Sequence, residues 1–282
     1  MYQIDKIQSR LEELSSLELL AEVFTDIARA RLDRVRTGIE KNRLFVGEVA
    51  KVLHIVRVTA EDQGLSAARK KKVSASLVIT SNKRLYYGGL DTRVVDFYSA
   101  HSAYTGYVDR FVVGSVGVDI LKARNYPFAY EPVIFDRELP NLYELSLLAE
   151  KLNGYQKVIV YYPRFVTVLS QQPSFVDITG LVAATPESES EKYYIFEPEI
   201  DKILDFFEEQ VIAILLEQAF LESELARIGT QLTSMDQAQQ RAASLIEQED
   251  LLLAGAKRSL SSMRVLEMVA GMRQKKKFLE ML

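Results

Sequence analysis

The distribution of proline constrains this chain more than any other feature of its sequence. All seven prolines lie between residues 127 and 198, and none occurs in residues 1–126 or 199–282. A proline inside a helix removes a backbone donor and clashes with the preceding turn. Both ends of the chain are therefore free to form long helices.

Both proline-free ends carry apolar residues every three or four positions, the pattern of one apolar helix face. At the N-terminal end the stripe consists of Ile4, Ile7, Leu11, Leu14, Leu17, Ala21, Phe24, Ala28, Leu32, Val35 and Ile39. At the C-terminal end it includes Ile203, Phe206, Phe207, Val211, Ile214, Leu215, Ala219, Leu221, Leu225, Ile228, Leu232, Met235, Ala238, Ala242, Leu245 and Ile246, and continues through Leu260, Met263 and Val269. A helix of about 80 residues would be roughly 120 Å long, too long for a globular domain of this size to surround. Since each stripe needs a partner, the sequence predicts an antiparallel coiled coil of the two ends.

Between the two ends, segments rich in β-branched and aromatic residues alternate with helical segments. The strand-like segments are residues 74–81, 110–121, 132–135 and 157–165, with further edge strands at 165–170, 175–180 and 193–198. Helices are expected at about 91–102, 118–125 and 139–153. This alternation predicts a small Rossmann-like α/β domain with a mostly parallel sheet.

The predicted organisation has four parts, and the polar stretch after the first helix marks one boundary. An N-terminal coiled-coil helix (1–58) is followed by a linker (59–72), a central α/β domain (73–198) and a C-terminal coiled-coil helix (199–282). The fold class is therefore α/β, framed by long terminal helices.

Composition excludes several classes of function. The net charge of −4 argues against a nucleic-acid binder, which would normally show a strongly basic face. Cysteine is absent, so neither a disulfide framework nor a thiolate site is expected, in keeping with a reducing cytosol. No apolar run approaches the ~20 residues that span a bilayer. The N-terminus resembles neither a signal nor a transit peptide.

Known catalytic and phosphate-binding motifs are not present. There is no G-x-x-x-x-G-K-[ST] or G-x-G-x-x-G sequence, and we interpret Gly88-Gly89 as a structural turn. For the two histidines, His54 and His101, a surface or packed position is expected rather than a metal site. The acidic pairs 12–13 and 208–209 lie on amphipathic helices, which predicts solvated faces. Three basic clusters are either solvated surface or a contact for an acidic partner surface, and the sequence leaves both interpretations open. They are Arg29, Arg31, Arg34 and Arg36; Lys70 to Lys72; and Lys275 to Lys277.

Several separated segments resemble the gamma subunit family of ATP synthase. The segment LLAEVFTDIARARLD (19–33) is similar to the family's N-terminal helix, and TSNKRLYYGGLD (80–91) to its signature T-S-D-R-G-L-C-G-G-L-N. Residues 161–180, which contain the family's S-Q-x-P (here Ser170, Gln171 and Pro173), and FEPE (196–199) also match. Two further segments resemble the long C-terminal helix, LESELARIGTQLTSMDQAQQRAASLI (221–246) and AKRSLSSMRVLEMVAG (256–271).

This resemblance implies a non-catalytic rotary shaft. Its partners would be an alpha/beta-type catalytic hexamer, an epsilon-type subunit and a membrane ion-translocating ring, on the cytoplasmic face of a bacterial-type inner membrane. No catalytic, cofactor or metal site is implied, because the hexamer carries the ATP chemistry. Positions matching the family's contact segments are Phe24, Arg29, Arg31, Asn82, Lys83, Lys257, Arg258 and Glu267.

The departures from the family pattern keep two alternatives open. Asn82 and Lys83 replace the signature aspartate and arginine, Gln231 replaces a helix arginine, and Arg264 stands where the family has a glutamate. One alternative is therefore the shaft of an accessory ATPase that is not devoted to ATP synthesis. The other is a coiled-coil adaptor without a rotary partner; a small nucleotide enzyme would need a phosphate loop.

Overall fold

The computed structural model describes residues 2–62, 71–83, 88–102, 108–179 and 200–279. Two long helices, α1 (Tyr2–Asp62) and α6 (Ile200–Leu279), enclose the remaining elements in sequence. Those elements are β1 (Lys71–Ile79), α2 (Leu90–Ser102), β2 (Val108–Val113), α3 (Ser115–Ala123), β3 (Glu131–Val133), α4 (Leu142–Asn153), β4 (Tyr155–Thr167) and β5 (Ser170–Asp177). The chain divides into two compact units: a helical unit, Met1–Ile27 with Met235–Leu282, and a mixed unit, Ala28–Ser234.

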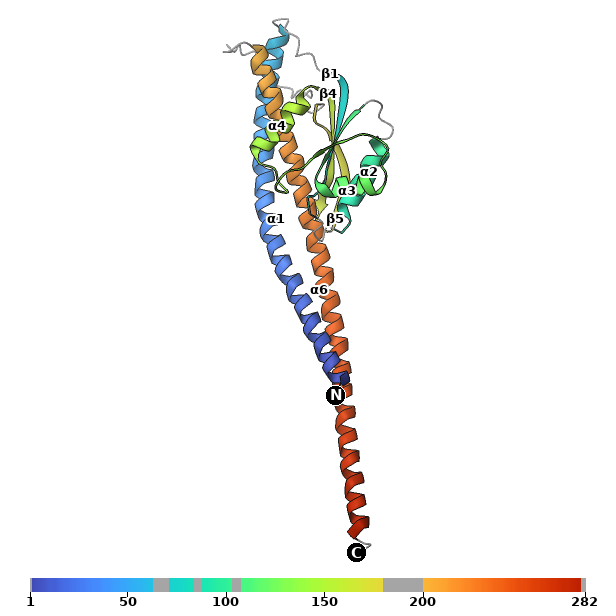
Figure 1. Cartoon of the computed structure of the whole chain (residues 1–282). Coiled ribbons are helices and arrows are strands. Elements are labelled where there is room, and N and C mark those ends of the chain that lie inside the picture. Colours follow the sequence, from blue (N-terminus) through green and yellow to red (C-terminus); the bar gives the residue numbers. More distant parts are fainter. Residues whose placement is uncertain (1, 63–70, 84–87, 103–107, 180–199, 280–282) are drawn as a thin grey trace. The chain divides into compact units, whose positions relative to one another are not determined.

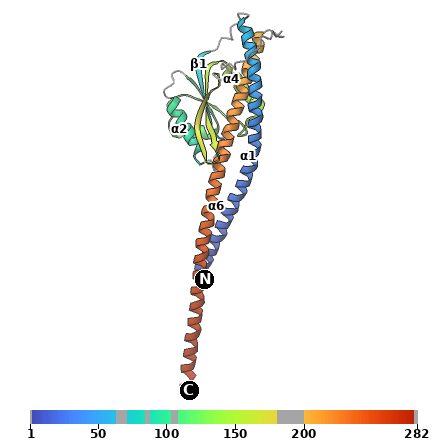
Figure 2. The ribbon, with the colours of Figure 1, turned by 180° about the vertical axis from the view of Figure 1, so that it is seen from behind.

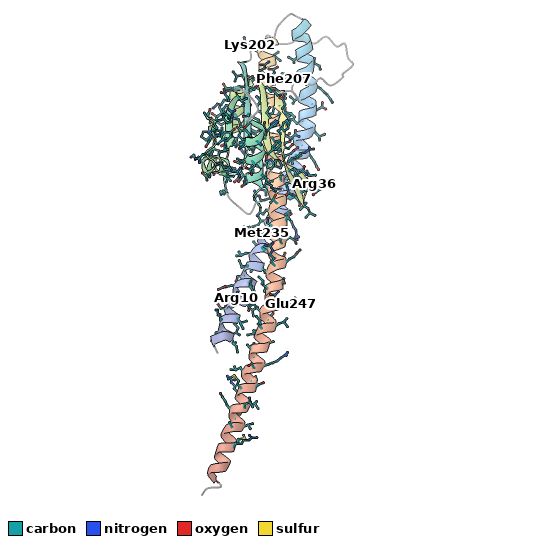
Figure 3. All side chains as sticks on the ribbon, turned by 90° about the vertical axis from the view of Figure 1, so that its right-hand side faces the viewer. Arg10, Arg36, Lys202, Phe207, Met235 and Glu247 are labelled. Carbon is teal, nitrogen blue, oxygen red and sulfur yellow. The ribbon has the colours of Figure 1, made fainter. Side chains whose placement is uncertain are left out.

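The helical unit pairs the start of α1 with the second half of α6. Arg10 Nη1 lies 3.0 Å from Glu249 Oε1, and Figure 3 shows Arg10 beside the stretch of α6 that carries Glu247. Ala21, Met235 and Ala242 are buried between the two helices. The predicted pairing of the two ends is therefore present in this unit.

In the helical unit most buried and half-buried positions recur every three or four residues, and they correct part of the predicted stripe. On α1 they are Ile4, Ile7, Leu11, Leu14, Glu18, Ala21, Phe24 and Thr25, whereas Leu17 is 57% exposed. On α6 they are Met235, Gln239, Ala242, Ile246, Glu249, Leu253, Ala254, Ala256 and Leu260, whereas Ala238 and Leu245 are exposed. Most predicted positions are therefore buried or half-buried, and Leu17 and Ala238 were each chosen one residue away because polar Glu18 and Gln239 occupy the seam there.

The mixed unit contains a five-stranded sheet in the order β3-β2-β1-β4-β5. The first four strands are parallel, and β5 pairs antiparallel with β4 at one edge. The connection from β3 crosses to the other side of β1, so α4 covers the face opposite to α2 and α3, as right-handed crossovers require. Figures 1 and 2 show α2 and α3 on one face of the sheet and α4 with α6 on the other.

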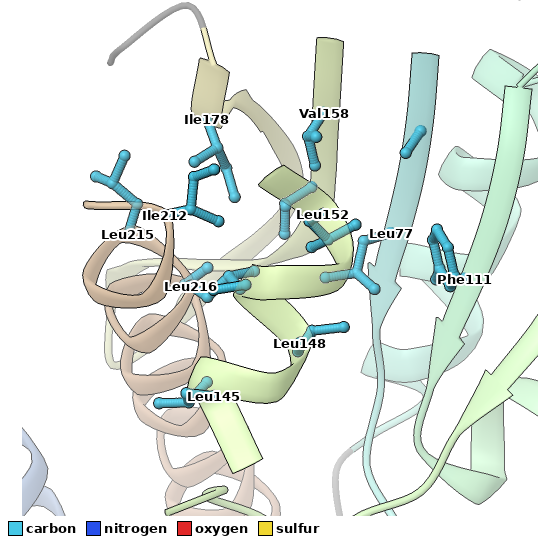
Figure 4. Close-up of a cluster of buried hydrophobic side chains, with 14 of the residues drawn as sticks. Leu77, Phe111, Leu145, Leu148, Leu152, Val158, Ile178, Ile212, Leu215 and Leu216 are labelled. Atoms are coloured by element: carbon cyan, nitrogen blue, oxygen red, sulfur yellow. The ribbon is translucent and has the colours of Figure 1, made fainter. Parts of the chain in front are cut away.

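The larger hydrophobic core lies between the sheet, α4 and α6. The buried face of α4 consists of Leu145, Leu148, Ala149 and Leu152, and α6 contributes Val211, Ile212, Leu215, Leu216, Ala219 and Phe220. In Figure 4 the leucines of α4 lie between Leu77 on β1 and Leu216 on α6. Asn141 and Glu144 form a capping box, which fixes the start of α4 at Leu142. The α/β domain is thus built onto α6.

Two expectations about the sheet are wrong in detail. Residues 115–121 are not strand, because Gly114, with a φ of 92°, ends β2 and α3 begins at Ser115. The β-branched Val116 and Val118 are helical since this segment packs against the sheet, so tertiary packing overrides local propensity. In the 165–170 segment, β4 ends at Thr167 and a hairpin turn follows before β5. The strand expected at 193–198 lies outside the described residues.

Candidate partner-contact residues and a buried ion cluster

The sheet changes its winding direction between β1 and β4, where open α/β sheets commonly bind ligands. Thr80, just after β1, donates to the carbonyl of Val113 at 2.6 Å and accepts from the Gly117 N–H at 3.0 Å. A Cβ at Gly114 would lie 2.4 Å from the Thr80 carbonyl oxygen, so only glycine fits there. The carboxyl ends of β1 and β2 are therefore tied closely together.

The Gly88-Gly89 turn docks against α6. Both glycines have positive φ, 52° and 71°, which confirms the interpretation as a structural turn. A Cβ at Gly88 would come within 2.8 Å of Thr230 Cγ2, and Leu90 is fully buried in a cluster with Ala226. The described part of this loop is thus a packing surface for the long helix.

A buried cation lies at the same junction. The side chain of Arg227 on α6 is 1% exposed and faces three carboxylates, from Asp91, Glu138 and Glu224. Its Nε lies 3.9 Å from Asp91 Oδ1, and its Nη1 lies 3.9 Å from Glu138 Oε2 and 3.7 Å from Glu224 Oε2. None of the three guanidinium nitrogens has a hydrogen-bond partner among the described residues. Arg227 is therefore held by charge rather than by direct hydrogen bonds.

Asp91 and Glu138 are both held by the segment that follows β1, whereas Glu224 is held by α1. Asp91, in the first turn of α2, accepts from the backbone N–H and the hydroxyl of Ser81. Glu138, in the segment before α4, accepts from the backbone N–H groups of Asn82 and Lys83 at 3.0–3.1 Å. Glu224 also pairs with Arg31 of α1. We call Arg227, Asp91, Glu138, Glu224 and Arg31 the ion cluster.

The predicted contact residues on α1 have different environments. Phe24 is half-buried, one position before the seam residue Thr25, which is 8% exposed and donates to the Ala21 carbonyl at 2.8 Å. Arg29 is exposed, as predicted for a surface residue. Arg31 instead belongs to the ion cluster of its own chain.

The predicted contact residues of the signature loop also differ from each other. The Asn82 side chain donates to the carbonyls of Phe135 and Arg137 and accepts from the Ser115 N–H. Asn82 is therefore engaged within its own domain, where it fastens the end of β1 to neighbouring loops. The Lys83 side chain is exposed.

The predicted contact residues near the C-terminus, Lys257, Arg258 and Glu267, are all exposed on α6 in the helical unit. Large apolar side chains are exposed around them: Met263 57%, Val265 55%, Leu266 67%, Met268 59%, Val269 43% and Met272 70%. Every described side chain from residue 261 to 273 is exposed. Continuous apolar exposure of this kind marks a surface that another protein covers.

The remaining candidate groups have packed or structural positions. His101 is stacked on the rings of Phe97 and Phe175, and its Nδ1 lies 2.5 Å from the Tyr161 hydroxyl. The prediction of solvated acidic pairs is wrong for Glu208, which is 3% exposed because α6 packs on the domain there. Within the described ranges, no three His, Cys, Asp or Glu side chains are placed to hold a metal ion. The side chain of His54 lies outside the part that the structure describes.

In one unit the two terminal helices pair with each other, and in the other an α/β domain packs on the long helix α6. The chain belongs to the ATP synthase family, whose model matches residues 3–272. Within that family it is a gamma-type chain, a non-catalytic subunit. The predicted family, fold class and non-catalytic role are confirmed.

Relatives of similar length support this assignment. The chain is 24% identical to the ATP synthase gamma chain of Staphylococcus saprophyticus, over 96% of this chain and 98% of the relative. It is 25% identical to that of Pelotomaculum thermopropionicum, over 94% and 96% of the two chains. A structure of Euglena gracilis mitochondrial ATP synthase (OSCP/F1/c-ring) has the same fold, with a TM-score of 0.65 and 14% identity, covering 96% of this chain and 93% of that chain.

The ion cluster was not predicted from the sequence, in which Arg31 was expected to contact a partner. A signal was available, because Glu224 and Arg227 lie three residues apart and directly precede the apolar positions Leu225 and Ile228. A charged pair inside an apolar stripe indicates burial with partners. The partners Asp91 and Glu138 could not be found, since the fold alone brings them to α6.

Proposed function

We propose that this chain is the rotating central shaft of an F-type ATPase, which couples ion flow through a membrane ring to ATP synthesis or hydrolysis in a catalytic hexamer. The observation that carries this proposal is the double character of α6. Its first half is built into the core of the α/β domain, and its later part exposes a continuous apolar surface. A helix that is anchored at one end and uncovered at the other suits a shaft inserted into a partner.

The hexamer-facing part of the shaft is assigned to the helical unit, and the α/β domain to the side of the ring and the epsilon-type subunit. Asymmetric contact with the shaft gives the catalytic sites different affinities, and rotation exchanges them, which is a coupling free energy between distant sites. Phe24, Arg29, Lys83, Lys257, Arg258 and Glu267 are the proposed contact residues. Asn82 and Arg31 belong to the same contact segments, although the chain itself engages their side chains.

We assign the complex to the membrane as a peripheral assembly, on the cytoplasmic face of a bacterial-type inner membrane. The bacterial origin of the two gamma chains named above supports this location. Among the described residues, no helix is both long and apolar enough to cross a bilayer.

Three experiments test the proposal. A tagged chain purified from its native source should bring with it an ATPase hexamer and ring subunits, whereas a coiled-coil adaptor would not. In membrane vesicles, ATP synthesis driven by an imposed ion gradient separates a synthase shaft from an accessory ATPase that only hydrolyses. By calorimetry, the isolated chain should not bind ATP, and micromolar binding would contradict the non-catalytic role.

A further inference from the structure

The ion cluster holds a buried cation where α6 meets the α/β domain, and its geometry has mechanical consequences. The apolar contacts between α6 and α4 are extensive but non-directional, because hydrophobic burial depends on area rather than orientation. Leucines that pack on leucines tolerate small rotations and slides of a helix. Such contacts hold the helix on the domain but fix its rotational setting less sharply than directional contacts do.

Ionic contacts in a buried site are directional by comparison. The carboxylates of Asp91 and Glu138 come from two separate segments of the domain, and each is fixed by backbone N–H donors. Rotation of α6 about its axis would move Arg227 away from both carboxylates and leave buried charges unpaired, which is costly. One rotational position of the helix satisfies the whole cluster.

We propose that the ion cluster is the joint that fixes the rotational position of α6 relative to the α/β domain. Arg227 is its positioning residue, and Asp91 and Glu138 are the contacts on the domain side. Glu224 and Arg31 extend the joint to α1, so that both helices of the coil are held. Under the proposed function, torque that enters at the domain passes to the coil through this joint.

Anion binding is a weaker explanation for a buried arginine beside the first turn of α2. Three carboxylates lie within 4 Å of the Arg227 guanidinium, so its charge is already compensated. An incoming phosphate would meet these negative groups first. The arginine therefore binds the protein's own carboxylates.

Two variants of the full chain test the joint. The neutral variant combines Arg227→Met, Asp91→Asn and Glu138→Gln. These changes remove three charges, keep side chains of similar volume, and leave an amide oxygen at 91 and at 138 for the backbone N–H donors. Arg227→Lys keeps the charge, but a single ammonium cannot face several carboxylates as the planar guanidinium does. Arg10→Met is the matched control. Arg10 of α1 pairs with the buried Glu249 of α6, the helix that also carries Arg227, but this pair belongs to the helical unit and not to the α/β domain.

Spin-label distances in the isolated chain measure the joint directly. The sequence contains no cysteine, so Lys122→Cys on α3 and Glu209→Cys on α6 give two unique label sites in the mixed unit. The parent chain and the Arg10→Met variant should each show one narrow distance distribution. The neutral variant should stay folded by circular dichroism with a broad distribution, and Arg227→Lys should broaden it less. If the distance distribution of Arg227→Lys, or of the folded neutral variant, is as narrow as that of the parent chain, the ion cluster does not fix the rotational position of α6.

Measurements on the assembled complex then separate this inference from the proposed function. The neutral variant should retain ATP hydrolysis and lose most hydrolysis-driven ion pumping, since the hexamer still turns a coil that slips on its domain. Full pumping by the neutral variant would refute a role in torque transfer. If the parent chain assembles with no hexamer, the proposed function fails, whereas the label distances still decide whether the joint exists.

Discussion

The two parts of α6 carry similar apolar patterns, but the side chains of one part are buried and those of the other are exposed. In the mixed unit almost every side chain from Val211 to Gln231 is buried or half-buried, including the charged Glu224 and Arg227. In the helical unit every described side chain from 261 to 273 is exposed, including Leu266 at 67% and Met272 at 70%. One continuous helix thus serves its own domain along one stretch and leaves another stretch uncovered.

This difference shows that an apolar stripe does not say which molecule will cover it. A soluble monomer rarely keeps so many large apolar side chains uncovered on adjacent turns. The first stretch contributes to folding of this chain, and the second is available for association. The predictions below test that division, ordered by their expected effect on the free energy of unfolding.

The same substitution in the two stretches should differ most. Leu216→Ala removes a fully buried side chain from the core of Figure 4 and should lower the free energy of unfolding by about 2–5 kcal/mol. Leu266→Ala removes an exposed side chain and should change it by no more than ~0.5 kcal/mol. Urea unfolding followed by circular dichroism measures both. Equal losses would mean that the isolated chain covers its second stretch.

The pairing of the helical unit should permit a specific crosslink across the span of the Arg10–Glu249 ion pair. Treated with a short bis-maleimide, the Arg10→Cys/Glu249→Cys variant should form an intramolecular crosslink and gain roughly 2–4 kcal/mol over its untreated form, as for a disulfide that closes a long loop. Arg10→Cys/Leu266→Cys is the control, because Leu266 lies well beyond Leu260, the last seam position. Gel mobility and urea unfolding provide the readouts. Exclusively intermolecular crosslinks in the first variant would contradict the hairpin.

The sequence predicted the helices and strands better than it predicted the register of the helix pair or the ion cluster. The proline distribution and apolar spacing were enough to predict two long helices, and the alternation of strand-like and helical segments was enough to predict a mostly parallel sheet, because those signals are local and repeated many times. The register of the seam needed the structure, since Glu18, Thr25, Gln239 and Glu249 occupy positions at which spacing favoured apolar neighbours. Burial of a polar seam residue depends on what the opposite helix presents, which a single sequence does not contain.

The ion cluster was harder to predict for a related reason. Asp91 and Glu138 lie far from Arg227 in sequence, and only the parallel sheet and its crossovers bring them together. The same holds for α3, where Gly114 and packing against the sheet override the β-branched composition. Local patterns therefore predicted the elements, and tertiary contacts decided their junctions.

A smaller effect concerns Tyr155 at the start of β4. Burial, and then the hydrogen bond to Asp109 at 2.7 Å, raises the pKa of its hydroxyl to about 12. A pKa raised above the unfolded value of about 10 means that the stabilisation is complete below pH 10 and is lost as the pH rises toward 12. Tyr155→Phe should cost about 0.5–1.5 kcal/mol at pH 7.

The pH dependence of the free energy of unfolding distinguishes the parent chain from Tyr155→Phe. Above pH 10 the parent chain should lose more stability than Tyr155→Phe, as measured by urea unfolding at several pH values. Some dependence should remain in the variant, because burial raises the pKa of Tyr98 and Tyr161 as well. Parallel curves for the parent and the variant would show that Tyr155 does not contribute.

The smallest change in stability with a functional consequence is expected at Phe24, compared with its neighbour Thr25. Phe24 is half-buried beside the seam, so in Phe24→Lys the ammonium can reach solvent along the helix edge and the cost should be about 1 kcal/mol or less. Thr25 is 8% exposed in the seam, so Thr25→Lys should bury a charge and disrupt the pairing. In the complex, Phe24→Lys should preserve assembly and ATP hydrolysis but reduce ion pumping. The reason is that the new charge would lie at a position proposed to contact the catalytic hexamer, where an ion pair with an acidic side chain would hinder rotation. Thr25→Lys should instead lose assembly and all activities together. If Phe24→Lys loses assembly in step with pumping, Phe24 is a core residue of the coil and the contact lies elsewhere on the shaft.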